Sequence, residues 1–140
     1  MFNGADYEYR YEFNCGGYAF DTFDWYLPYS WEFDIDHDLN EENREKVMEE
    51  WVECMLKDFE GRLRVVQNEK DVAESERLIL FRSRLTPNTD FHYVVRKGRN
   101  FFHKLGCTPE FRRIKKEEVF SDEWPFGYDG PIVMMAYRVP

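Results

Sequence analysis

Aromatic and charged residues alternate along the first part of the chain. Every second residue between positions 6 and 13 is aromatic, which is the period of a half-buried β-strand. Gly16 and Gly17 follow at once and predict a turn, so residues 18–26 are expected to return as a hairpin partner. Apolar and acidic residues alternate again over residues 31–38 and predict a third strand.

Apolar residues then recur at helical spacing. The stripe predicts an amphipathic helix with acids on its other positions, built on Val47, Trp51, Met55, Phe59 and Leu63. Asp38 is the expected N-cap, and Glu41 lies three residues later, as in a capping box. We expect Gly61 to end or weaken this helix.

The second half of the chain is predicted to form shorter helices and strands. Residues 77–85 and 91–95 flank a loop with Pro87 and Asn88 and predict a hairpin, while residues 98–106 predict a short helix. Strands are expected at residues 110–116 and 131–139. The predicted fold is α+β, an antiparallel sheet with one main amphipathic helix and one or two short helices, and residues 1–140 form a single domain.

Composition narrows the class of protein. The chain is 19% aromatic, enough for a packed core although 34% of its residues are charged. Its three cysteines are widely spaced and form no CxxC motif, which favours a reduced cytoplasmic setting. No apolar run approaches the roughly 18 residues of a membrane span, so we expect a soluble protein.

Charge divides the chain into two unlike parts. Residues 1–60 carry a net charge of −13 and residues 61–140 a net charge of +4, within the total of −9. Between positions 82 and 116 the bases are opposed only by Asp90 and Glu110. Such asymmetry indicates either internal neutralisation or a dipolar surface that steers a charged partner.

The acidic residues form the predicted site. Acids at alternate positions of the third strand share one face, and others extend along the helix; the set is Glu32, Asp34, Asp36, Asp38, Glu42, Glu45 and Glu49. A solvated strand edge and helix initiation are the structural alternatives. The excess charge favours an acidic inhibitor or immunity-type protein that occludes the basic, nucleic-acid-binding surface of a partner protein. We predict no catalytic residue and no cofactor for this function.

The same acids approximate a calcium-binding loop. Oxygen-bearing residues from Asp34 to Glu45 follow the spacing of an EF-hand. Leu39 occupies the position where that loop turns sharply on a glycine, and the preceding residues alternate like a strand rather than a helix. We therefore predict no metal site.

Other functions are carried as alternatives. The basic stretch "HYVVRKGRNFFHK" interleaves cations with aromatic residues, a combination that contacts phosphates and stacks bases. "GRNFFHKLGCTPEFRRI" followed by "PIVMMAYRV" resembles the C-terminal part of GCN5-related N-acetyltransferases over about forty residues. That resemblance implies a helix before the last two strands, with Gly98 and Arg99 near the coenzyme. A structural or assembly role is a further alternative.

Cysteine and histidine chemistry has no signature in the linear sequence. Cys54 falls on the helical apolar stripe and is expected to be a buried small hydrophobe, while Cys15 in the glycine turn is expected to be the more exposed thiol. No histidine lies near Cys15 in the sequence. A Cys/His arrangement brought together by the fold is left open.

Overall fold

The structure, a computed structural model, describes residues 14–22, 26, 39–86, 90–104 and 111–140. Its elements in chain order are α2 (Cys15–Phe20), α3 (Arg44–Asp58), β1 (Leu63–Val66), the 3₁₀ helix η1 (Glu69–Asp71), β2 (Arg77–Arg84), β3 (Asp90–Lys97), β4 (Asn100–Lys104), β5 (Phe111–Ile114), α4 (Lys116–Val119), the 3₁₀ helix η2 (Pro125–Gly127) and β6 (Val133–Tyr137). The predicted strands at residues 6–13 and 31–38 lie outside the described residues.

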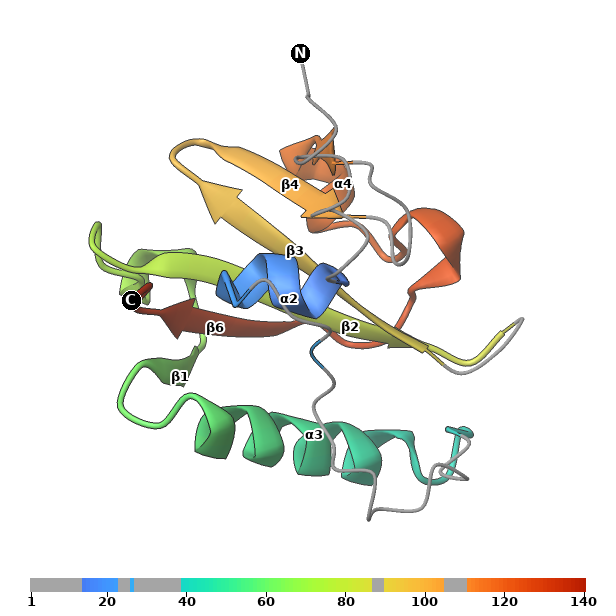
Figure 1. The fold of residues 1–140 in the computed structure, drawn as a ribbon. Coiled ribbons are helices and arrows are strands. Elements are labelled where there is room, and N and C mark those ends of the chain that lie inside the picture. The colour runs from blue at the N-terminus through green and yellow to red at the C-terminus, as the bar shows by residue number, and fades with distance from the viewer. Residues whose placement is uncertain (1–13, 23–25, 27–38, 87–89, 105–110) are drawn as a thin grey trace, which may run out of the picture.

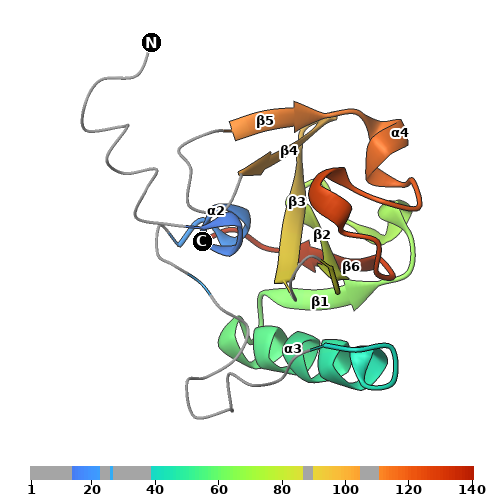
Figure 2. The ribbon, with the colours of Figure 1, turned by 90° about the vertical axis from the view of Figure 1, so that its right-hand side faces the viewer.

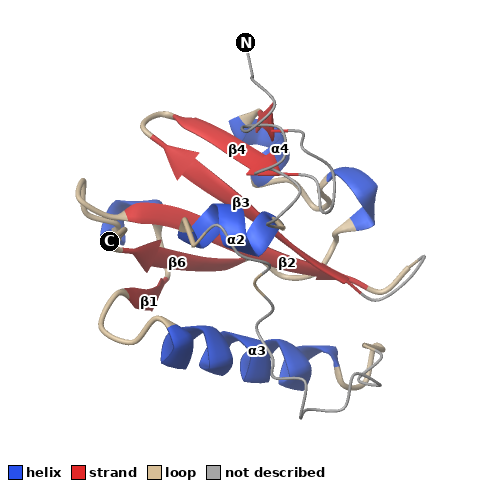
Figure 3. Ribbon diagram, viewed as in Figure 1, coloured by secondary structure: helices blue, strands red, loops and turns tan. Residues whose placement is uncertain are grey.

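The strands form one antiparallel sheet in the order β1-β6-β2-β3-β4-β5. One long helix and two short ones accompany it, as Figure 3 shows, and the predicted α+β class is confirmed. The β2–β3 hairpin and the closing strand β6 were expected from their alternating or apolar patterns, and both are present. None of the helices in the described part of the chain has the length and apolar character needed to span a bilayer.

The sheet separates two apolar cores. Alternate residues of β2 face opposite ways, so that Ile79 and Phe81 join the core beneath α2 and α3, and Leu78 and Leu80 join the core beneath α4. Figure 2 shows α2 and α4 on opposite sides of the sheet, with α3 beside β1. Both faces of β3 are therefore buried, and residues 91–95 are buried without interruption.

Residues 15–20 form α2, so the prediction that Gly16 and Gly17 make a turn before a strand at residues 18–26 is wrong. The Asn14 side chain caps α2 by accepting a hydrogen bond from the Gly17 amide at 2.9 Å. Gly16 is needed for close packing, since a Cβ there would lie 3.2 Å from the Tyr93 ring. Figure 1 shows α2 lying across the middle of the sheet.

Packing at the other end of α2 offsets its poor helix propensity. The Phe20 ring stacks on Phe59 with centroids 4.1 Å apart and meets the edges of Tyr93 and Tyr137. Arg77 donates to the Ala19 carbonyl at 2.7 Å. Burial of Phe20 and these contacts outweigh the cost of two helical glycines, which is roughly 1 kcal/mol each.

Three further sequence predictions are corrected. Residues 100–104 form strand β4 rather than a helix, so the helix implied by the acetyltransferase resemblance is not found there. The main helix begins at Arg44 after a turn, with Asn43 as N-cap, which places Glu41 before the helix instead of in a capping box. Leu63 begins β1, because the chain leaves α3 at Asp58 and turns through Gly61 at a φ of 81°.

Candidate functional site

Cys15 is the first residue of α2, and its position is set by Asn14. The Asn14 Oδ1 atom accepts hydrogen bonds from the backbone amides of Gly17 and Tyr26, while Nδ2 donates to the Tyr26 carbonyl at 2.7 Å. Asn14 is itself 4% exposed. The start of α2 is therefore tied to a second segment of the chain, which limits the movement of the thiol.

The Cys15 thiol lies against β3 and β4. α2 packs on these two strands, and Cys15 is 5% exposed, so the prediction of an exposed thiol is wrong. Burial raises the pKa of the thiol to about 12, although backbone hydrogen bonds at Tyr93 and Gly16 and the nearby Lys104 ammonium favour the thiolate. The thiol is therefore protonated at neutral pH and needs a base to become nucleophilic.

A buried histidine pair lies on the same two strands. His92 Nε2 and His103 Nδ1 are 2.9 Å apart, and the side chains are 5% and 4% exposed. The hairpin register, with Val95 opposite Phe102, places the histidines diagonally on one face of the sheet.

Desolvation keeps both histidines neutral. Burial, the neighbouring His103 and the Arg84 guanidinium lower the pKa of His92 to about 3. Burial and Arg112 lower the pKa of His103 as well. One ring must donate and the other accept in the 2.9 Å contact; if His92 donates through Nε2–H, its Nδ1 lone pair is left to accept a proton.

An aromatic wall holds the His92 ring. Tyr128 stacks on it with centroids 5.0 Å apart, and Trp124 meets it edge-on at 6.1 Å. Arg84 covers the outer face of Tyr128 at 4.7 Å from the ring centroid. The Tyr128 hydroxyl donates to Asp90 at 2.9 Å. These contacts leave the His92 ring little freedom to rotate.

Electrostatic coupling connects the thiol to this wall. Asp90, two residues before His92, raises the pKa of Cys15. Burial and the Asp90 carboxylate raise the pKa of Tyr128, and Cys15 adds to that rise. The thiol contacts the β3 backbone at Tyr93, while His92 packs on the Tyr128 side of the strand. Cys15 and His92 therefore lie on opposite faces of the sheet, and the fold does not bring this thiol and this imidazole together.

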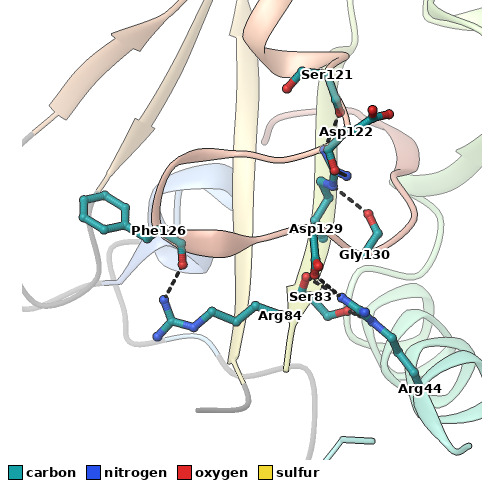
Figure 4. Close-up of polar contacts among 9 residues, drawn as sticks. Arg44, Ser83, Arg84, Ser121, Asp122, Phe126, Asp129 and Gly130 are labelled. Atoms are coloured by element: carbon teal, nitrogen blue, oxygen red, sulfur yellow. Dashed lines mark hydrogen bonds and ion pairs between the residues drawn. The ribbon is translucent and has the colours of Figure 1, made fainter. Parts of the chain in front are cut away.

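Three arginines fix the loop that supplies the wall (Figure 4). Arg82 donates to the carbonyls of Gly130, Ser121 and Asp122 at 2.6 to 2.8 Å, and is 3% exposed. Arg84 donates to the Phe126 carbonyl at 3.0 Å, and Arg44 joins Ser83 and Asp129. The Ser121–Gly130 loop is therefore held at its beginning, middle and end.

The predicted acidic site is only partly within the described residues. Glu32, Asp34, Asp36 and Asp38 lie outside them. Glu42, Glu45 and Glu49 are exposed, Glu42 in the turn before α3 and the other two on the helix. They are not brought near Cys15 or the histidines. Within the described residues no group of three or more His, Cys, Asp or Glu side chains has a geometry that would hold a metal ion.

The basic residues of the second half are largely engaged. Lys104 is fully buried, Lys97 lies over the Tyr18 ring, and Arg96 pairs with Glu69. Gly98 and Arg99 form the exposed turn between β3 and β4. The ion pairs recorded for the described part of the chain use acids from residues 61–140 and none from residues 39–60. The two oppositely charged sets are thus not folded against each other there.

The sequence predictions missed the His92–His103 pair. A strand assignment for residues 100–104 would have revealed the pair, since a hairpin turning at Gly98 puts His92 and His103 on neighbouring strands. The approach of α2 has no local sequence signal. Comparison with known proteins found no family model, no curated protein and no solved structure that matches this chain.

Proposed function

We propose that the exposed acids of α3 bind a basic protein surface, as expected of an inhibitor-like protein. The observation that carries the proposal is that the acids described on α3 make no ion pair within the described residues, so their charge is available to a partner. The buried Cys15 and His92 carry no catalytic proposal, because they lie on opposite faces of the sheet.

Salt dependence tests this proposal. Binding of a basic partner to the α3 face should weaken as salt rises, because salt screens the attraction between exposed charges. A partner that binds equally well at low and high salt would contradict it.

A further inference from the structure

A groove runs between α3 and the edge of the sheet. Its volume is about 770 Å³, and α3, β1 and β6 supply its lining. Figures 1 and 2 both show α3 lying alongside β1, the last strand on that side of the sheet. The groove therefore lies at the β1 edge of the sheet, and β5 forms the opposite edge.

The floor of this groove is apolar. Met48 and Val52 contribute from α3, and Val65 and Val133 contribute from β1 and β6. Val65 is 41% exposed and lies on β1, the edge strand of the sheet. Apolar surface of this kind in a concave site favours contact with apolar side chains of a partner.

The rim of the groove is acidic. Glu45, Glu49 and Glu53 follow one another at intervals of four residues, which on a helix is a rise of about 6 Å per step. None of them forms an ion pair in the described part of the chain. Arg44 also lines the groove, but its charge is compensated by Asp129 at 2.9 Å.

We infer that this groove docks a basic amphipathic helix of a partner protein, whose lysines or arginines at i and i+4 face the rim while its apolar stripe covers the floor. Cations at this helical interval repeat every 6 Å or so, matching the carboxylates, whereas alternate residues of a strand repeat at about 6.8 Å. The inference rests on the function proposed above and assigns it a site and a partner chemistry.

Peptide binding tests the inference. A fluorescein-labelled Lys/Leu amphipathic helix should bind the protein in low salt by fluorescence anisotropy, and the same peptide with Glu for Lys should not. Glu45→Lys with Glu49→Lys should weaken binding by roughly tenfold or more. The matched control carries Glu74→Lys with Glu117→Lys, two exposed acids outside the groove, and should bind much more tightly than the groove variant.

The outcomes separate the site from the function. If the two pairs of substitutions weakened binding equally, the groove would not be the binding site. Salt-dependent binding of a basic partner would still stand. Failure of the Lys/Leu peptide to bind the unchanged protein, or equal binding of the Glu/Leu peptide, would overturn both. A dimer that the groove substitutions dissociate in sedimentation would show that the occupant is a second copy and would overturn the partner assigned here.

Discussion

Titratable groups are buried around His92 but exposed on the outer face of α3. Around His92 the titratable groups are buried, neutral or paired, and each is held by several contacts. Along α3 the carboxylates extend into solvent without ion pairs in the described residues. Buried groups that satisfy one another hold the fold together, whereas recognition of a charged partner uses exposed charges whose effect salt can screen. The contrast indicates a structural role for the first region and agrees with the binding role proposed for the second.

Removal of a buried arginine should have the largest effect. Arg82→Met leaves the carbonyls of Gly130, Ser121 and Asp122 without their donor and should lower the free energy of unfolding by about 3 kcal/mol, measured by urea denaturation. Arg64→Met is the exposed counterpart, where loss of the Glu76 pair should lower the free energy of unfolding much less, because solvent screens this pair. Equal costs would contradict the view that the Ser121–Gly130 loop depends on its arginines.

Acid should destabilise the protein through His92. The unfolded chain binds a proton on this residue below about pH 6.5, but the folded chain does so only near pH 3, so acidification favours unfolding. Between about pH 7.5 and about pH 5 the contribution is roughly 2 kcal/mol, and it disappears in His92→Phe. Urea midpoints at the two pH values measure it. An unchanged pH dependence in the variant would mean that His92 titrates normally.

The smallest effect is expected on α3. Glu45→Lys with Glu49→Lys should change the free energy of unfolding by less than about 0.5 kcal/mol, because both side chains are exposed and make no ion pair in the described residues. Thermal and urea denaturation of this variant are sufficient. A large loss of stability would show that these acids have a structural role and would contradict the view that the α3 face serves binding alone.

The sequence predicts correctly those elements that have a clear local pattern of apolar and polar residues. The β2–β3 hairpin and β6 have patterns that no competing structure explains as well, and the apolar stripe of α3 places that helix to within a few residues. β4 was misread because Phe101, Phe102 and His103 fit a helix or a strand equally, and pairing with β3 decides between them. α2 forms because Phe20 is buried among rings distant in sequence.

The buried histidine pair could not be read from the chain in the same way. His103 lies on a strand predicted to be a helix, and that local error concealed its pairing with His92. The aromatic wall that fixes His92 comes from Tyr128, which is 36 positions further along the chain. Long-range packing of this kind carries no periodic signal. The acids of α3, in contrast, were visible as charge alone.

The binding role of the α3 face is tested most directly by the affinity of the Lys/Leu helix for the unchanged protein and for the variant with Glu45→Lys and Glu49→Lys. Fluorescence anisotropy at low salt measures both affinities. We predict a fall of roughly tenfold or more in the variant, and weaker binding to the unchanged protein as salt rises. Equal affinities of the two proteins at low salt would contradict the proposed function.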